Sequence, residues 1–149
     1  MKVLPIFALV FSIFLSAADH PDFSGTWEFS SAKSKNVGMM ADMKLTAVVK
    51  QTPNELVITN LHDGRQSSET RFNLMGEADK NVGPMGDKAE TTSKWEGSKL
   101  VTTWTSPGAV AGTQTVRIET RSLSADGRLL TIESVRGKNP PMVMVYERK

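Results

Sequence analysis

Apolar and polar residues alternate with a period of two through most of the chain after residue 18. Alternation of this kind, in Thr- and Val-rich segments bounded by turn residues, predicts half-buried β-strands. In the first such segment, Phe23, Gly25, Trp27 and Phe29 fall on one face. The pattern predicts nine strands, at about residues 23–29, 45–49, 56–59, 66–75, 88–95, 100–105, 114–123, 129–135 and 142–148.

Short turn signals separate most of these strands. A connection of two to five residues joins antiparallel neighbours, because a parallel crossover needs a dozen residues or more. An open sheet of this size would expose two edges, and closure removes them. The sequence therefore predicts an all-β fold, an antiparallel up-and-down meander closed into a β-barrel of about 8–10 strands. Clear turn signals are T-P-N-E (52–55), H-D-G-R (62–65), E-G-S (96–98) and S-A-D-G (124–127).

Two segments interrupt the alternation. Residues 76–87 hold three glycines and a proline, which predicts a loop. Residues 32–43 are the one place for a helix, but the segment is short and contains Gly38. We expect a brief helix or a lid-like loop there.

The N-terminus has the pattern of a signal peptide. Lys2 precedes a short apolar core, Val3 to Leu15, and Ser16-Ala17-Ala18 supplies the small residues of a cleavage site. The apolar run is shorter than the ~20 residues of a membrane span, although an uncleaved anchor is the alternative. The prediction is a signal peptide at 1–18, a single domain at 19–149, and export to the periplasm or the outside.

Composition narrows the function classes. The chain has no cysteine, so disulfides and Cys-based metal or redox chemistry are excluded. Of 18 basic residues one, Lys2, lies in the signal peptide, and 16 residues are acidic. The charge is thus nearly balanced, and with no run of five like charges the chain does not favour nucleic acid as a partner. Short strands and a single tyrosine argue against a membrane β-barrel, so we expect no integral membrane protein once processed.

Several short motifs resemble the calycin superfamily, which includes the lipocalins and the fatty-acid-binding proteins. Gly-x-Trp (25–27) on the first strand is a feature of both. K-W-E-G-S (94–98), T-R-S-L-S-A-D-G-R-L-L-T (120–131) and V-Y-E-R-K (145–149) follow the order of the fatty-acid-binding branch. The intracellular members have no signal peptide, and they carry a helix-turn-helix that residues 31–43 are too few to form. The chain therefore looks like a bacterial secreted lipocalin-like domain with C-terminal motifs similar to fatty-acid-binding proteins.

The resemblance implies a ligand inside the barrel, small and apolar or fatty. Arg121 matches the family's internal arginine, allowing one inserted residue, and Tyr146 matches its terminal tyrosine. In the family such groups hold a fatty carboxylate by charge-assisted hydrogen bonds. Met144 stands where the family has a further arginine, which favours a more apolar grip. The alternative for Arg121 is a solvated charged stripe with Arg117 and Glu119, since all three fall on one strand face.

Methionines and aromatic residues complete the candidate ligand-binding set. Met is flexible and polarisable and suits variable apolar surfaces. In a calycin the segment after the first strand lies over the open end, so the resemblance implies a methionine-lined mouth; core filling is the alternative. Phe72, Trp95 and Trp104 line a cavity or belong to the core. The methionines are Met39, Met40 and Met43 after the first strand, and Met142 and Met144 on one face of the last strand.

Trp27 is expected to be structural. In lipocalins this tryptophan packs across the closed end of the barrel under an arginine, through apolar contact and a cation–π interaction. Arg148 and Arg121 are the candidates for the cation.

No constellation typical of an enzyme is present. There are two histidines, His20 near the mature N-terminus and His62 in a turn beside Asp63, and no metal-ligand spacing or phosphate loop. We expect no enzyme, no cofactor and no metal site. Two hypotheses remain: a carrier of a small apolar or fatty ligand, or a barrel filled with side chains that acts as a protein-interaction or envelope module.

Overall fold

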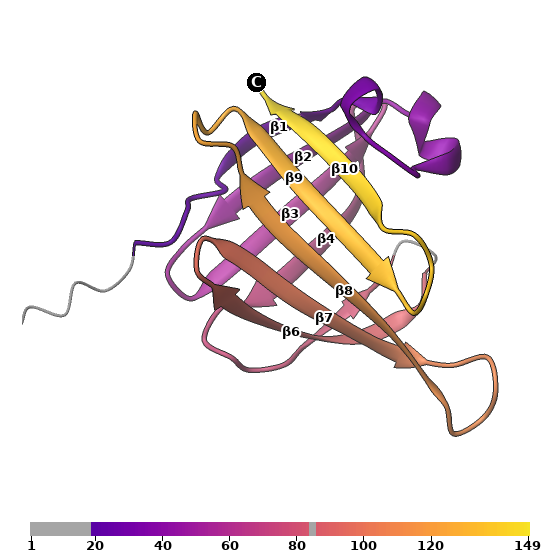
Figure 1. Ribbon diagram of the computed structural model, residues 1–149. Coiled ribbons are helices and arrows are strands. Elements are labelled where there is room, and N and C mark those ends of the chain that lie inside the picture. The colour runs from indigo at the N-terminus through magenta and orange to yellow at the C-terminus, as the bar shows by residue number, and fades with distance from the viewer. Residues whose placement is uncertain (1–18, 84–85) are drawn as a thin grey trace, which may run out of the picture.

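The protein is described here from a computed structural model, over residues 19–83 and 86–149 (Figure 1). The predicted signal peptide lies outside the described residues. Ten strands in this part of the chain form one antiparallel sheet in the order β4-β3-β2-β1-β10-β9-β8-β7-β6-β5. The strands are β1 (Gly25–Phe29), β2 (Leu45–Gln51), β3 (Glu55–His62), β4 (Arg65–Asn73), β5 (Asp79–Val82), β6 (Lys88–Glu96), β7 (Lys99–Pro107), β8 (Gln114–Leu123), β9 (Leu129–Arg136) and β10 (Met142–Arg148).

The predicted fold class is confirmed. Successive strands pair antiparallel from β1 to β4 and from β5 to β10, and β1 pairs with β10, so the sheet curls into a nearly closed barrel. Turn chemistry fixes the register of each hairpin. Between β6 and β7, for example, Glu96 lies opposite Lys99, and the loop residue Gly97 has a positive φ of 60°, which glycine adopts without steric cost.

One prediction was wrong: residues 76–87 are not all loop. Strand β5 (Asp79–Val82) lies within them and pairs with β6. Its four residues, D-K-N-V, show no apolar alternation, so pairing with β6 decides the conformation where local propensity does not.

The barrel closes between β4 and β5 through side chains. Asn81 accepts a hydrogen bond on Oδ1 from the Arg71 amide N–H (3.2 Å), and its Nδ2 donates to the Arg71 carbonyl (2.7 Å) and to Thr91 Oγ1 (2.8 Å). The Asp79 carboxylate also accepts the N–H of Asn73. One amide side chain thus satisfies both backbone groups of Arg71. We call this junction the seam (Arg71, Asn73, Asp79 and Asn81).

The segment after β1 forms two short 3₁₀ helices, η1 (Ser31–Lys33) and η2 (Gly38–Asp42), which confirms the expected brief helix. It is tied to β10: Lys35 forms an isolated β-bridge with Val143, and the Val145 N–H donates to Ser34 Oγ (2.9 Å). Among the described residues, no helix has the length and apolar character needed to cross a membrane.

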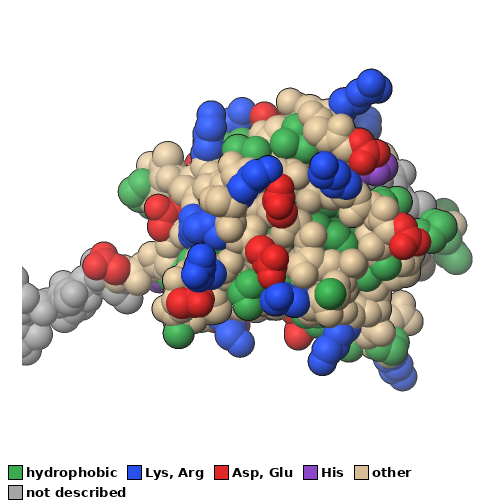
Figure 2. Space-filling view, turned by 90° about the horizontal axis from the view of Figure 1, so that it is seen from above, with side chains coloured by type: hydrophobic (Ala, Val, Ile, Leu, Met, Phe, Trp, Pro, Cys, Tyr) green, Lys and Arg blue, Asp and Glu red, His purple; other side chains and the backbone are tan. Residues whose placement is uncertain are grey.

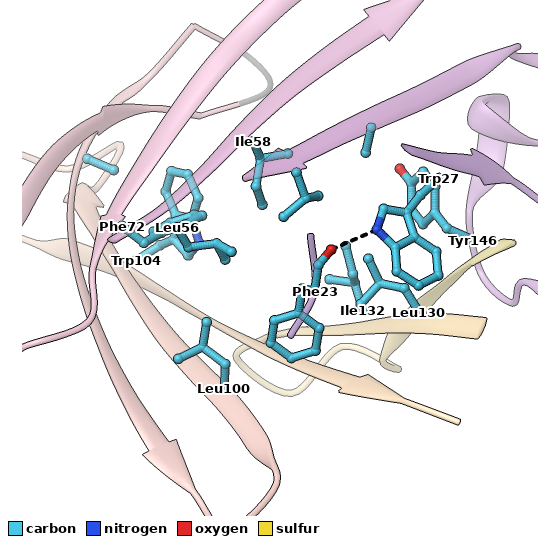
Figure 3. Close-up of a cluster of buried hydrophobic side chains, with 13 residues drawn as sticks. Phe23, Trp27, Leu56, Ile58, Phe72, Leu100, Trp104, Leu130, Ile132 and Tyr146 are labelled. Carbon is cyan, nitrogen blue, oxygen red and sulfur yellow. Dashed lines mark hydrogen bonds between the residues drawn. The ribbon is translucent and has the colours of Figure 1, made fainter. Parts of the chain in front are cut away.

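Phe23, Trp27 and Arg148 pack together at one end of the barrel. We call these three residues the plug. The Trp27 indole N–H donates to the Phe23 carbonyl at 2.9 Å (Figure 3). The Arg148 guanidinium lies 4.2 Å from the centre of the Trp27 ring and donates to the carbonyls of Ser24 and Gly127 (2.7 and 3.0 Å). The arginine expected over Trp27 is therefore Arg148.

The plug also explains Gly25 in the Gly-x-Trp pattern. Gly25 has a φ of +135°, and a Cβ there would lie 2.7 Å from Arg148 Nη1. A side chain would both strain the backbone and push the arginine off Trp27.

Candidate functional site

Strand β8 points its charged side chains into the barrel and its apolar side chains toward solvent. It alternates charged and apolar residues, and the charged face points into the barrel: the side chains of Arg117, Glu119 and Arg121 are 11%, 7% and 6% exposed. On the opposite face Val116 and Ile118 are 44% and 43% exposed. The solvated charged stripe is therefore wrong as an interpretation of these residues.

The pairing register of β8 with β7 and β9 explains why its charged face points inward. Arg121 lies opposite Leu100 on β7 and Ile132 on β9, and both of those side chains are buried in the core. With neighbours on both sides facing inward, the period of two forces Arg121 and its i−2 and i−4 partners inward as well.

The three residues form a buried ion-pair triad, which we call the arginine cluster (Arg117, Glu119 and Arg121). Glu119 Oε2 lies 2.7 Å from Arg121 Nη2, and Glu119 Oε1 lies 3.2 Å from Arg117 Nη1. Within the described part of the chain, Glu119 is the one carboxylate that pairs with either arginine. Two cations thus share one anion, and the cluster carries one uncompensated positive charge.

Two aromatic rings enclose the cluster. The Arg121 guanidinium lies 4.8 Å from the centre of the Phe72 ring, and that of Arg117 lies 4.4 Å from the Trp104 ring. Phe72 and Trp104 meet edge to face at 5.7 Å, and Figure 3 shows them together with Leu56, apart from the plug. These aromatic faces stabilise the guanidinium groups in a place where water does not solvate them.

Polar residues of β6 and β7 extend the cluster. Arg121 Nη1 donates to Thr102 Oγ1 (3.4 Å), and the hydroxyl of Thr102 shares a hydrogen bond with that of Ser93 (2.9 Å). Both hydroxyl residues are buried. The inner wall formed by β6, β7 and β8 is therefore polar, although it lies inside the barrel.

Two buried donors of this group have no hydrogen-bond partner among the described residues, Arg121 Nε and Trp104 Nε1. Buried donors in folded proteins are nearly always paired, and an unpaired one costs about 1–3 kcal/mol. The cluster therefore combines an uncompensated charge with two unused donors, both of which suit an acceptor with negative charge.

Tyr146 lies beside Trp27 (Figure 3), within electrostatic range of Arg121 and Glu119. Burial raises the pKa of Tyr146 to about 12; the Arg121 charge opposes that rise, and the Glu119 charge adds to it. At neutral pH the phenol therefore keeps its proton. Met144, on the same face of β10, is half-buried and packs against the core.

The other predicted site residues lie away from the cluster. Trp95 is half-buried and stacks between His20 (4.3 Å between ring centres) and Phe23 (5.7 Å), so it belongs with the plug. Met142 is half-buried at the start of β10. The structure does not gather the methionines of the expected mouth into the core: Met39 and Met43 are exposed, and η2, which also holds the half-buried Met40, has no buried residue.

Two surface recesses lined by described residues lie away from the arginine cluster. Of the recesses lined by described residues, one of about 540 Å³ lies at the β3–β4 hairpin, and one of about 520 Å³ lies on the outer face of β1 and β2. On the face viewed in Figure 2, acidic and basic side chains are interspersed. Exposed ion pairs such as Lys33–Glu147 (2.7 Å) contribute little to stability. The uncompensated charge therefore lies inside the barrel, at the arginine cluster.

Sequence reasoning missed part of this site. Glu119 and Arg117 were noted as neighbours of Arg121 but assigned to solvent, and Thr102 and Ser93 were not considered. The available signal was weak: an Arg-x-Glu-x-Arg repeat at positions 117–121 has the strand period, but the period does not say which face is inside.

Comparisons with known proteins bear on the fold. No family model matches the chain, and a comparison with curated proteins found no match. Among solved structures, the chain is similar to the REP1-NXSQ fatty acid transporter (TM-score 0.67, 16% identity, 85% of this chain and 95% of that one). It is also similar to Echinococcus granulosus fatty-acid-binding protein 1 (0.66, 18%, 85% and 96%) and to apo Caenorhabditis elegans lipid binding protein 8 (0.64, 13%, 85% and 95%). At such identities the likeness establishes the barrel fold.

Proposed function

We propose that the protein binds a small anionic amphiphile, such as a fatty acid, inside the barrel with its carboxylate at the arginine cluster. The observation that carries this proposal is the inverted strand β8, which buries Arg117, Glu119 and Arg121 and exposes Val116 and Ile118. Selection for stability alone favours the opposite orientation. Violations of this kind concentrate at functional sites.

Charge supports the same assignment. A buried charge without a partner is costly, and the arginine cluster has one positive charge more than its single carboxylate neutralises. A ligand carboxylate makes the group neutral. Arg121 Nε is a free donor for it. Hydrogen bonds of a cation to a carboxylate are among the stronger ones in proteins.

An apolar region for a ligand tail adjoins the cluster. Ile58, Leu100, Leu130 and Ile132 are buried in the same core as Phe72 and Trp104. The similar solved structures are a fatty acid transporter, a fatty-acid-binding protein and a lipid binding protein. Both facts favour an aliphatic ligand with one acidic head over a wholly apolar one.

Entry of a ligand needs an opening, and the seam is the best candidate. Elsewhere neighbouring strands are joined by backbone ladders, whereas β4 and β5 are joined through the side chains of Asn81 and Asp79. Separation at the seam breaks few hydrogen bonds and leads directly to Thr91, which Asn81 contacts inside the barrel.

We further propose that binding takes place outside the cytoplasm, since residues 1–18 have the pattern of a signal peptide. The protein then acts as an exported, periplasmic or extracellular carrier. It has no cysteine, so its stability in an oxidising compartment rests on packing.

A filled barrel that works through its outer surface is the second candidate. The observation that favours it is the tightness of the interior: Leu56, Leu100 and Thr102 are 0% exposed, and the two recesses described above lie outside. The two candidates differ in whether any small molecule enters.

Native mass spectrometry separates them. The protein is purified from its own host and measured before and after organic extraction. The proposal predicts an extractable bound mass with an acidic group, and re-uptake of a fatty acid by the extracted protein. A bare polypeptide mass, with no uptake from a mixture of fatty acids, would overturn the carrier function and favour the filled barrel.

A further inference from the structure

We propose that the Trp104 indole N–H selects ligands that carry a second oxygen acceptor in addition to the carboxylate, that is, oxygenated acids in preference to plain ones. This inference rests on the proposed function and names the substrate class more narrowly. The two buried donors without a partner, Arg121 Nε and Trp104 Nε1, need different acceptors.

A single carboxylate accounts for one of the two donors. The Nη1 and Nη2 atoms of Arg121 each donate one hydrogen bond, to Thr102 and Glu119, so Nε is the one nitrogen of that guanidinium without a partner among the described residues. A carboxylate that meets this Nε gives each of the three nitrogens a partner. Trp104 Nε1 is still left, and an indole N–H can only donate.

None of the described residues places an acceptor within hydrogen-bonding distance of the Trp104 indole N–H. Arg117 lies over the face of its ring and is itself a donor, and Phe72 meets it edge to face. The acceptor for Trp104 is therefore assigned to the ligand.

Trp27 shows what the same side chain does when it has only a structural role. It is buried like Trp104, and its indole N–H donates to the Phe23 carbonyl at 2.9 Å. A buried tryptophan normally finds such a partner. Trp104 departs from this rule in the one part of the interior that also holds an uncompensated charge.

The chemistry of the second acceptor follows from the donor. A keto, ether or hydroxyl oxygen on the aliphatic part of the ligand accepts from an indole N–H, while a plain alkyl chain leaves that donor unpaired on binding. A site with a buried donor discriminates against ligands that lack the acceptor, because the unpaired group is then sealed from water.

The test compares hexadecanoate with a series of hexadecanoates that each carry one keto group at a different carbon. Affinities are measured by calorimetry for the unaltered protein, for Trp104→Phe and for Trp95→Phe. Trp104→Phe keeps an aromatic ring and removes the N–H. Trp95→Phe makes the same chemical change at a tryptophan that stacks with Phe23 and His20 instead. Circular dichroism confirms that each variant is folded.

The unaltered protein is expected to bind at least one keto acid about tenfold more tightly than hexadecanoate, as one buried hydrogen bond implies. Trp104→Phe is expected to lose this preference, so that it binds the keto acids no more tightly than hexadecanoate, whereas Trp95→Phe is expected to keep the preference. Hexadecanoate binding without any preference for a keto acid, or a preference that survives in Trp104→Phe, overturns the inference and leaves the proposed function standing. If no acid binds to the unaltered protein, both fail.

Discussion

An arginine lies over a tryptophan in two regions of the barrel. The indole N–H has a hydrogen-bond partner in one region and none among the described residues in the other. In the plug, Arg148 lies 4.2 Å from the Trp27 ring, and the indole and the guanidinium both donate to backbone carbonyls. Near the arginine cluster, Arg117 lies 4.4 Å from the Trp104 ring, and the indole has no partner in the described part of the chain.

We interpret the plug as a structural contact and the arginine cluster as a candidate binding site. The plug is complete, because its donors are satisfied and its arginine reaches solvent. The arginine cluster is incomplete, because it lies in the core with an excess charge and with free donors on Arg121 and Trp104. Unpaired buried donors are rare in folded proteins and call for an explanation, which is why we propose a ligand at this place.

The largest expected effect concerns the single carboxylate of the cluster. Glu119→Gln leaves two buried arginines without an anion and is expected to lower the free energy of unfolding by about 3–5 kcal/mol. Arg121→Met removes the excess charge and leaves the Arg117–Glu119 pair, so its expected loss is below about 1 kcal/mol. Urea denaturation measures both. Equal losses in the two variants would mean that the cluster carries no excess charge.

The phenol of Tyr146, which lies within electrostatic range of Arg121 and Glu119, can be titrated in the folded protein. Its pKa is about 12 in the folded protein against an ordinary value of 10.0. The neutral phenol is therefore favoured by folding, and its stabilisation is fully present below pH 10 and is lost as the pH rises through about 12. The loss amounts to roughly 2–3 kcal/mol.

The measurement is direct because Tyr146 is the one tyrosine of the chain, so the near-ultraviolet absorbance of tyrosinate reports on it alone. Tyr146→Phe is expected to lack this part of the alkaline loss of stability. A midpoint near pH 10 in the folded protein would show that the hydroxyl is solvated and that this part of the interior is not dry.

The smallest effect compares the two tryptophans. Trp27→Phe and Trp104→Phe remove the same atoms from buried positions, but only the first leaves a carbonyl, that of Phe23, without its donor. Trp27→Phe is expected to be more destabilising than Trp104→Phe by about 1–3 kcal/mol, as thermal or urea denaturation shows. The reverse order would indicate that Trp104 has a structural hydrogen bond after all.

Much of the shell could be predicted from the sequence, because its signals are local. The alternation around Trp27 and the Asp-Gly and Glu-Gly turns define antiparallel strands and hairpins, and these are confirmed. Strand β5 was missed because its four residues depend on β6 and on the side chain of Asn81. Contacts between distant segments leave no periodic pattern in the chain.

The candidate site was harder to read for a different reason. On β8 the sequence left open whether Arg121 reaches a ligand or belongs to a solvated stripe with Arg117 and Glu119, and the structure places these side chains inside the barrel and Val116 and Ile118 outside. Only the cross-strand partners Leu100 and Ile132 fix the face, and that register belongs to the whole barrel. The polarity pattern of β8 alone therefore does not identify its inward face.

The most direct test of the central claim, that the arginine cluster receives the anionic head of a ligand, is a calorimetric comparison of a fatty acid with the fatty alcohol of equal chain length. We expect the protein to bind the acid at least about tenfold more tightly than the alcohol, and Arg121→Met to abolish the difference while the variant stays folded. Equal affinities for acid and alcohol, or no binding of either, would contradict it.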